Sequence, residues 1–338
     1  MKLKTVLGIF AVCCTCFTVQ AQQKFRVMEY NVENLFDCRH DSLKQDQEFL
    51  PDSPKGWSVN RYQDKLNKIA KVILAASADQ VPDLVGLCEV ENEYCLDGLT
   101  KYSPLRDAGY RYVMTNSPDE RGVDVALLYQ PATFRPVSTQ YIGIPYKEIQ
   151  RRPTRDILHV AGRVISGDTL DVFVCHMPSR SGGEAKSEPY RLFTARFLRR
   201  AADSVMSVRQ NPHVVIMGDF NDYPSNRSIA EVLGAVKPGK RVQKHTLYNL
   251  MDGREGGTYR YRGEWGILDQ MIVNGGMLQK KSKIRTRYDE AQILRFPFLL
   301  EEDDRYGGDT PARTYFGKRY HGGYSDHLPI AVDLYIKD

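Results

Sequence analysis

Short apolar runs separated by turn-forming residues recur along most of the chain, which is the pattern of β-strands. The first clear run is Phe25–Asn31 and the last is His327–Ile336. Between them we expect strands over residues 84–89, 111–115, 123–129, 134–142, 156–165, 170–176, 213–217, 266–273 and 281–287. Helical spacing instead marks Asn60–Ala76 and Glu188–Val208, with a shorter helix at Ile229–Leu233.

The predicted elements are many strands and few helices, which indicates an α/β protein. They do not fit a barrel in which strands and helices alternate. Two packed sheets with helices outside them fit the pattern better. No polar linker divides residues 22–338, so we expect them to form a single domain. The least regular segments are 37–57, 182–187 and 296–323, and a loop as long as the last usually has a functional reason.

The N-terminal segment has the features of an export signal. Lys2 and Lys4 precede an apolar run from Val6 to Val19, and small residues close it at Ala21. We interpret residues 1–21 as a secretory signal peptide that is cleaved after Ala21. An N-terminal membrane anchor is the alternative, but the run is short for a span. We therefore expect an exported protein, periplasmic or extracellular, without stable membrane insertion after cleavage.

Charge and cysteine content narrow the function only slightly. The formal net charge is +5, and the predicted cleavage removes two lysines and no acidic residue, which leaves +3. This mild excess permits nucleic acid as a partner without arguing for it. Four cysteines remain, without a paired zinc-binding spacing, and they are Cys38, Cys88, Cys95 and Cys175. An oxidising compartment would allow one disulfide, between Cys95 and either Cys38 or Cys88.

Polar side chains repeatedly follow the apolar runs. Asn31 ends the first predicted strand, Glu89 ends the second, and His176 ends a later one. Asp219 and Asn221 follow another, and their spacing of two places both on one side of an extended chain. Strand ends are where sheets place ligand sites, so this recurrence predicts that these side chains share one site.

These residue types together suit the hydrolysis of a phosphate ester. Hard oxygen ligands are available from Glu89, Asp219, Asp269, Asp326, Asn31 and Asn221. Such a set fits Mg²⁺, Mn²⁺ or Ca²⁺ and not a soft metal. His176 and His327 add groups that titrate near neutral pH. Asp269 is the most telling, because a carboxylate inside an apolar run is costly unless it is paired or used.

The motifs around these residues resemble those of the endonuclease/exonuclease/phosphatase superfamily, also called DNase-I-like. In chain order they are Glu29-Tyr-Asn-Val, Gly86-Leu-Cys-Glu-Val, His176-Met-Pro-Ser, Gly218-Asp-Phe-Asn-Asp, Ile267-Leu-Asp-Gln-Met-Ile and Ser325-Asp-His-Leu-Pro. They span nearly the whole mature chain, and the fourth and sixth are specific when they occur together. The resemblance implies a four-layer α/β/β/α sandwich of two packed mixed β-sheets with outer helices.

The resemblance also implies a role for each residue. Metal ligands would be Asn31, Glu89 and Asp326, and the metal would be Mg²⁺, with Mn²⁺ or Ca²⁺ as alternatives. The catalytic residues would be His176, Asp219, Asn221, Asp269 and His327. Asp219 and Asn221 would orient or deprotonate water and hold the phosphate, while Asp269 would orient His327. The implied reaction is in-line attack of water on phosphorus.

Basic residues outside the motifs carry a weaker prediction. Arg121, Arg155 and Arg180 would contact the substrate phosphate as bidentate donors, and the alternative is that they are solvated surface residues. Lys281, Lys283, Arg285 and Arg287 would share one face of a strand. They could track a nucleic-acid backbone, but we prefer the interpretation of a charged edge strand that blocks aggregation.

The core motifs do not select a substrate, so the loops must. We expect an exported nuclease first, and a phosphatase or phospholipid-type phosphodiesterase as alternatives. The acidic run Glu301–Asp304 would repel a polyanion if it lined the groove. The sequence shows no obvious exposed apolar hairpin of the kind expected in a membrane-active lipase of this family, although Phe296–Leu300 is a candidate. A catalytically retired binding scaffold would have lost Glu89, Asp219 or a histidine, and this chain keeps them all.

Overall fold

The computed structural model describes residues 22–77 and 80–337. The signal peptide predicted over residues 1–21 lies outside the described residues. None of the helices in the described part of the chain is long and apolar enough to cross a bilayer.

The first of the two large sheets contains seven strands and is mixed. Along the sheet the strands are β14 (Ile284–Arg285), β20 (Ile330–Lys337), β1 (Gln22–Leu35), β2 (Leu84–Val90), β4 (Asp124–Tyr129) and β3 (Arg111–Met114), and β15 (Gln292–Ile293) also pairs with β20. Strands β1 and β2 run parallel, and the other pairs are antiparallel. The segment predicted as a strand over residues 281–287 forms only the two residues of β14, which lies at an edge of this sheet.

The second sheet also contains seven strands of mixed direction. Its order is β5 (Phe134–Ile142), β6 (Ile157–Val164), β7 (Thr169–His176), β8 (Val214–Asp219), β13 (Asp269–Asn274), β10 (Leu247–Asn249) and β9 (Ala235–Val236). Strands β7 and β8 run parallel, as do β9 and β10. A one-turn π-helix at Ser228–Leu233 replaces the short helix predicted there.

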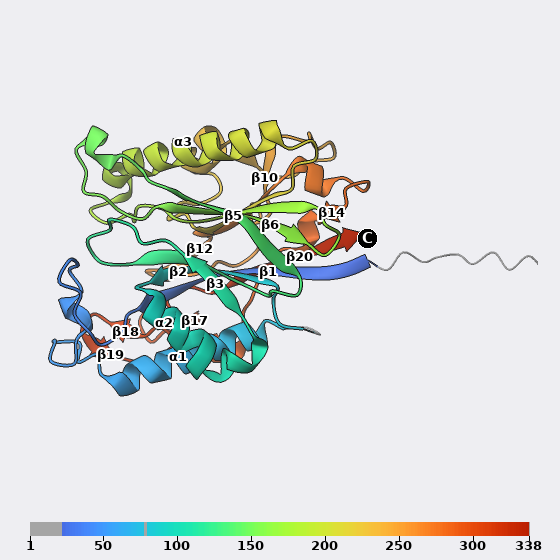
Figure 1. Ribbon diagram of the computed structural model, residues 1–338. Helices are drawn as coiled ribbons and strands as arrows, with labels where there is room; N and C mark the ends of the chain where they lie inside the picture. Colours follow the sequence, from blue (N-terminus) through green and yellow to red (C-terminus); the bar gives the residue numbers. More distant parts are fainter. Residues whose placement is uncertain (1–21, 78–79, 338) are drawn as a thin grey trace, which may run out of the picture.

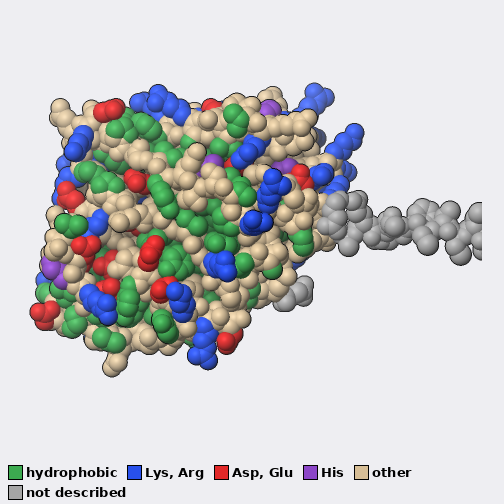
Figure 2. Space-filling model, in the orientation of Figure 1, with side chains coloured by type: hydrophobic (Ala, Val, Ile, Leu, Met, Phe, Trp, Pro, Cys, Tyr) green, Lys and Arg blue, Asp and Glu red, His purple; other side chains and the backbone are tan. Residues whose placement is uncertain are grey.

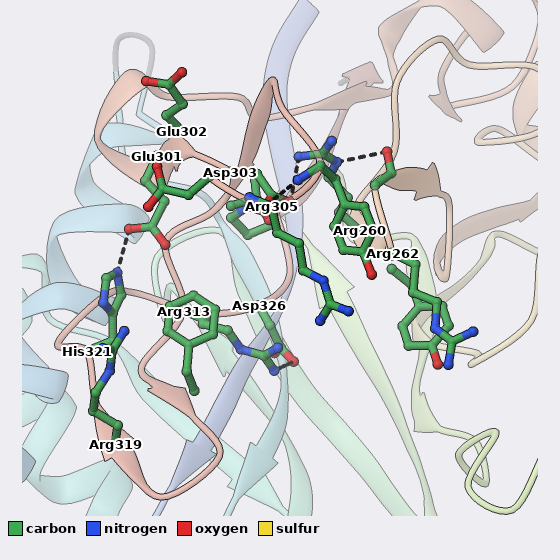
Figure 3. A pocket seen from close by; sticks show the side chains of 17 residues that line it. Arg260, Arg262, Glu301, Glu302, Asp303, Arg305, Arg313, Arg319, His321 and Asp326 are labelled. Carbon is green, nitrogen blue, oxygen red and sulfur yellow. Dashed lines mark hydrogen bonds and ion pairs between the residues drawn. The ribbon is translucent and has the colours of Figure 1, made fainter.

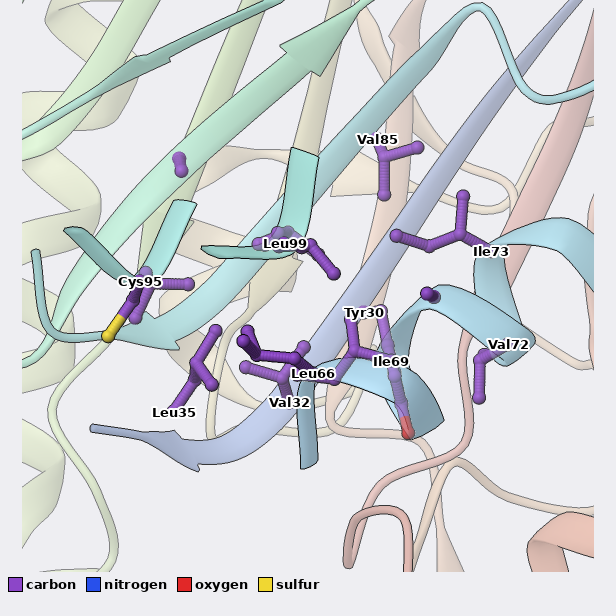
Figure 4. Packing of buried hydrophobic residues seen from close by; sticks show 14 of the residues in the cluster. Tyr30, Val32, Leu35, Leu66, Ile69, Val72, Ile73, Val85, Cys95 and Leu99 are labelled. Atoms are coloured by element: carbon purple, nitrogen blue, oxygen red, sulfur yellow. The ribbon is translucent and has the colours of Figure 1, made fainter. Parts of the chain in front are cut away.

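Three clusters of buried apolar side chains hold the two sheets and two helices together. Figure 1 shows α3 and α1 on opposite outer faces. Helix α1 (Val59–Ala75) buries its predicted stripe against β1, and Figure 4 shows Leu66, Ile69 and Ile73 beside Tyr30 and Val32. The middle cluster lies between the sheets, and helix α3 (Glu184–Val208) covers the third. The four-layer α/β/β/α sandwich is therefore confirmed.

Helix α3 begins one turn earlier than the sequence indicated. The prediction started it at Glu188 and left residues 182–187 irregular. In the structure the helix starts at Glu184, and Pro189 lies inside it. The Ser187 amide and hydroxyl both donate to the carbonyl of Gly183, which supports the added turn.

The segment over residues 296–323 is not a structureless loop. It folds into two hairpins, β16 (Leu300–Glu302) with β17 (Asp309–Pro311), and β18 (Tyr315–Phe316) with β19 (Arg319–Tyr320). Gly307 and Gly308 both have positive φ, which lets the chain reverse between β16 and β17. A third hairpin joins β11 (Tyr259–Tyr261) to β12 (Glu264–Gly266), so the strand predicted from Gly266 starts only at Asp269.

Two possibilities that the sequence left open are not seen in the structure. Residues Phe296–Leu300 do not form an exposed apolar hairpin, because a 3-10 turn at Pro297–Leu299 buries Leu299 and packs its neighbours on the first core cluster. The described cysteines form no disulfide. The Cys88 thiol contacts the carbonyl oxygen of Cys175 at 3.6 Å, and both residues are buried inside the sandwich.

The Arg26–Asp333 pair between β1 and β20 generates a stability prediction. Burial opposes charge on Asp333, but hydrogen bonds from Arg26 at 2.7 and 2.9 Å and contact with Lys24 outweigh it and lower the pKa of the carboxyl. Its contribution is present above the unfolded-state pKa of about 4 and is lost as pH falls through the folded pKa. We expect Asp333→Asn to reduce the free energy of unfolding by about 2 kcal/mol at pH 7.

Urea unfolding at pH 7 and pH 3 measures this effect. The difference between wild type and Asp333→Asn should shrink at pH 3. Asp107→Asn, at a carboxyl that is 84% exposed, is the matched control and should change little at either pH. An Asp333→Asn protein as stable as the wild type at pH 7 would contradict the prediction.

Candidate active site

Three polar residues form a row across the second sheet. His176 of β7 is the register partner of Asp219 of β8, and Asp219 is in turn the partner of Asp269 of β13. Because side chains alternate along a strand, each faces the same side as the residue two positions away. Met217 and Met271 lie in the cluster between the sheets, so the row points toward the first sheet.

The first sheet contributes to the same place from strands β1 and β2. Asn31 of β1 donates from its side-chain amide to Oδ2 of Asp219 at 3.1 Å, which joins the two sheets. Glu89 lies at a β-bulge in β2 and has a φ of +67°, which is strained for a residue with a side chain. The backbone amide of Asn34 donates to Glu89 at 2.9 Å and fixes its carboxylate. Strained backbone of this kind is typical of functional sites.

The backbone around Asp219 explains the spacing of its motif. Gly218 has a φ of +142°, and a Cβ there would lie 1.8 Å from the carbonyl oxygen of Cys175, so only glycine fits. Asn221 also has positive φ, and its backbone amide donates to Oδ1 of Asp219 at 2.8 Å. Its side-chain amide contacts Oδ2 of Asp219 and the carbonyl of Met177, both at 3.1 Å. The carboxylate is therefore held from several sides.

His327 reaches the row from the loop that precedes β20. Its Nδ1 lies 2.8 Å from Oδ2 of Asp269, and its Nε2 lies 3.9 Å from Oδ2 of Asp219. The hydroxyl of Thr258 accepts from the backbone amide of Asp269 at 3.3 Å, and the Thr258 carbonyl accepts from Leu328. Thr258 thus fixes the position of this loop relative to β13.

Asp219 lies between two buried histidines whose pKa values move in opposite directions. Burial and the nearby Arg155 lower the pKa of His176 well below its usual value, so this ring stays neutral. Burial also opposes charge on His327, but Asp269 and Asp219 outweigh it and raise its pKa well above the usual value. Burial raises the pKa of Asp219 to about 7. The site can therefore hold a neutral and a protonated imidazole beside one carboxyl group.

A cleft of about 730 Å³ opens above this row. Every residue predicted for the site lines it except Asp269, which lies behind His327. Tyr259, which sequence reasoning did not single out, also lines the cleft, and its ring centroid lies 4.9 Å from that of His327. The six motifs therefore converge on one concave site, as the sequence predicted.

The sequence matches the Endonuclease/Exonuclease/phosphatase family over residues 26–336. The chain belongs to this family. No curated protein matches its sequence. The fold is similar to a crystal structure of an endonuclease/exonuclease/phosphatase family protein from Bacteroides thetaiotaomicron, with a TM-score of 0.59 and 15% identity over 94% of this chain and 99% of that one.

Two further structures share the fold of the family. A mannosyl-6-phosphatase from Bacteroides thetaiotaomicron has a TM-score of 0.57 and 16% identity, covering 92% of this chain and 99% of its own. TDP2 from D. rerio, crystallised with a single-strand DNA product, has a TM-score of 0.56 and 14% identity, covering 92% and 98%. At identities this low, these similarities show the fold alone.

Within this family site, the three arginines predicted to contact phosphate have different environments. Arg121 is half-exposed over the cleft, 3.5 Å from Glu89. Arg155 is buried, and it pairs with Asp119 at 3.1 Å and donates to the carbonyl of Met177 at 2.8 Å. Arg180 donates to Asn221, Asp222 and Asn226, so it supports the loop after β8. Arg121 has the most donors left for a substrate.

Two oxygen-rich groups could hold a metal ion. Asn31, Glu89 and Asp326 line the cleft and offer the carboxylate and amide oxygens that Mg²⁺ prefers, with room for water. A second group, Asp219, Asp269 and His327, has ligand atoms within 4.8 Å of one another and is buried. In that group His327 and Asp269 already bind each other, and in the cleft set Arg313 binds Asp326 at 2.6 Å while Arg121 lies 3.5 Å from Glu89.

Two charged residues near the site had no role in the sequence prediction. Glu29 lies two positions before Asn31 and therefore faces the same side of β1, where burial and the nearby Asp269 raise its pKa well above the usual value. Arg313 binds Asp326 at 2.6 Å and contacts Glu33 at 3.6 Å. The strand period could have revealed Glu29, but no local pattern indicates Arg313, because its partner lies thirteen residues away.

The pairing of Asp269 with His327 predicts a measurable loss of imidazole basicity. In Asp269→Asn the charge that favours the imidazolium is removed while burial remains, so the pKa of His327 should fall by about one unit or more. NMR titration of the metal-free protein measures this value. His213, buried at the far end of β8, serves as an internal control and should not move. An unchanged His327 pKa would show that Asp269 does not hold its charge.

Proposed function

We propose that this protein is a metal-dependent hydrolase of phosphate esters. The observation that carries the proposal is the position of Asp219 between His176 at 3.4 Å and His327 at 3.9 Å, with His327 held by Asp269 at the base of an open cleft. The activation of water and the stabilisation of a phosphoryl transition state need a base and hydrogen-bond donors close together. The carboxylate, the neutral imidazole and the protonated imidazole supply these groups.

The chain's own residues divide this work. Asp219, fixed by the amides of Asn31 and Asn221, orients the attacking water and accepts its proton. The protonated His327 donates from Nε2 toward a phosphate oxygen and opposes its growing negative charge. Neutral His176 binds another phosphate oxygen through a ring N–H, beside Arg121 at the rim of the cleft.

Glu89, Asp326 and Asn31 are the residues that would hold the metal ion. The oxygen donors and the open cleft favour Mg²⁺, with Mn²⁺ and Ca²⁺ as alternatives. A bound divalent ion supplies Lewis acidity that lowers the charge on the phosphate. The Asn34 amide holds Glu89, and Arg313 holds Asp326, so both carboxylates are positioned in advance.

The class of phosphate ester that the protein hydrolyses is a more specific question than the type of reaction. The sequence favoured an exported nuclease, with a phosphatase or phospholipid-type phosphodiesterase as alternatives, and the fold is compatible with each. On the face shown in Figure 2, acidic and basic side chains are interspersed over much of the surface. That face therefore gives little of the continuous positive field that draws nucleic acid.

The proposed activity predicts metal-dependent cleavage of bis(p-nitrophenyl) phosphate by residues 22–338. EDTA should abolish turnover and Mg²⁺ or Mn²⁺ should restore it. Glu89→Ala and His327→Ala should each reduce kcat/KM by about a hundredfold or more, because each removes a group that acts on the transition state. Glu255→Ala, at an exposed position outside the cleft, is the control and should retain activity. Activity that survives both site substitutions would refute the proposed site.

Export is a separate proposal with its own test. Cleavage after Ala21 should give a mature protein that begins at Gln22 and is recovered outside the cytoplasm. Mass spectrometry of the N-terminus after expression of the full chain in a bacterial host measures this. Retention of residues 1–21 on the cytoplasmic protein would overturn it.

A further inference from the structure

A second cavity of about 870 Å³ adjoins the catalytic cleft. Tyr261 and Asp326 line both spaces, so a ligand in the cleft can extend past them into the second cavity. Figure 3 shows Asp326 with Arg313 at one side of this space and the charged side chains of the hairpins around it. An inference about this cavity rests on the proposed function, because it concerns the part of the substrate that does not react.

Three hairpins outside the two large sheets build the cavity. Its walls come from β11–β12, β16–β17 and β18–β19 together with the segment that leads to His327. The segment over residues 296–323, which looked irregular in the sequence, therefore forms much of the wall of this cavity. Loops placed around a rigid scaffold are where substrate selection is usually located.

Buried contacts hold these hairpins in place. The side chain of Arg260 is only 6% exposed and joins β11 to the β16–β17 turn, binding Asp303 at 3.1 Å and the carbonyls of Gly307 and Asp309 at 2.6 and 2.9 Å. His321, which follows β19, lies 2.5 Å from Glu301 of β16, and this contact joins the β18–β19 hairpin to the β16–β17 hairpin. The cavity is therefore a formed binding space, and not a gap between loose loops.

The charges on its walls are balanced. The basic side chains are Arg260, Arg262, Arg305, Arg313 and Arg319, and the acidic ones are Glu301, Glu302, Asp303, Asp304 and Asp326. A polyanion binds where a positive field follows its backbone, and the acidic run Glu301–Asp304 opposes such a field here. This cavity therefore disfavours the continuing strand of a nucleic acid as its occupant.

Several polar groups in the cavity remain available to a neutral ligand. Among the described residues, no opposite charge pairs with Glu302, Asp304 or Arg319. Arg262 and Arg305 lie over the rings of Tyr261 and Tyr306, with their charged groups 5.2 and 5.1 Å from the ring centroids. Both rings are about half-exposed. Carboxylate acceptors, guanidinium donors and flat apolar faces match the hydroxyls and C–H surfaces of a polyol ring.

We propose that this cavity binds an uncharged, hydroxyl-rich group, of glycosyl or polyol type, that carries the phosphate ester hydrolysed in the cleft. The phosphate lies beside Asp219 and His327, and the ester oxygen leads past Tyr261 and Asp326 to the hydroxylated part. The cavity is of a size that holds a small ligand of this kind. A site built to hydrogen-bond hydroxyls selects strongly against ligands that lack them.

Steady-state kinetics of the Mg²⁺-loaded protein over residues 22–338 tests this proposal. The substrates are glucose 6-phosphate, an oligosaccharide with a terminal 6-phosphate, p-nitrophenyl phosphate and a short single-stranded DNA. Tyr306→Ala should lower kcat/KM for the sugar phosphates by about tenfold, the effect of losing one good contact, and leave p-nitrophenyl phosphate within about twofold. Tyr102→Ala, at a tyrosine that is 72% exposed outside both cavities, is the matched control.

A charge variant gives an independent readout. Glu302→Ala combined with Asp304→Ala should lower turnover of the sugar phosphates by about tenfold and raise any cleavage of DNA, because acceptors and negative charge are removed together. Glu93→Ala with Asp107→Ala, two exposed acidic residues elsewhere, makes the same charge change and should alter neither. Thermal melting confirms that each variant is folded.

The kinetic results distinguish failure of the cavity proposal from failure of the proposed function. A wild-type protein that cleaves p-nitrophenyl phosphate or DNA but prefers neither sugar phosphate would overturn the cavity proposal and leave the proposed function standing. Equal effects of the substitutions on sugar phosphates and p-nitrophenyl phosphate would also overturn it. Absence of metal-dependent turnover on every substrate would overturn the proposed function, and this inference with it.

Discussion

The burial of a carboxyl group between two apolar sheets is the constraint on which this structure depends. Asp219 cannot remain charged there without partners, since isolated buried charge is expensive. Asn31, Asn221 and two histidines supply those partners from both sheets. The same contacts that make the buried carboxyl tolerable also fix the distance between the sheets at this end of the sandwich.

This arrangement links stability to chemistry. Away from the cleft, the facing side chains of β7, β8 and β13 are apolar and hold the sheets together. At one end of these strands the same facing positions become His176, Asp219 and Asp269, and the apolar layer gives way to a polar one. Positive φ angles at Glu89 and Asn221 lie beside them, and backbone of this kind is typical of functional sites.

The hairpins at the rim of the cleft serve a different purpose from the sheets. Tyr315 of β18 belongs to the first core cluster, and Trp265, Leu300 and Tyr320 pack against it. Charged contacts such as Arg260 with Asp303 and His321 with Glu301 connect the hairpins to one another. Their interactions are made by side chains distant in sequence, so their shape depends on pairs that no local pattern specifies. In the function proposed above, the hairpins would select the substrate and the row across β7, β8 and β13 would carry out the reaction.

The hydrophobic periodicity of the sequence and its six motifs were enough to predict the sandwich, the apolar stripe of α1 and the residues that meet at the cleft. Both are local properties of the chain. Asp269 could be identified as unusual because a carboxylate interrupts an apolar run. Local pattern failed where contacts between distant segments decide, as at the short β14 and the hairpins over residues 296–323. It also missed the first turn of α3, which contacts four residues apart support.

The sequence by itself determined which groups the site contains, since only their chemical types and their strand positions were needed. The tertiary structure decided how those groups are used. It gave Arg155 and Arg180 contacts within the protein at the edge of the cleft that they line, and it brought the acidic run Glu301–Asp304 beside the cleft. The physical reason is that electrostatic interactions and cavities depend on distances in space between segments far apart in the chain, and periodicity carries no information about those distances.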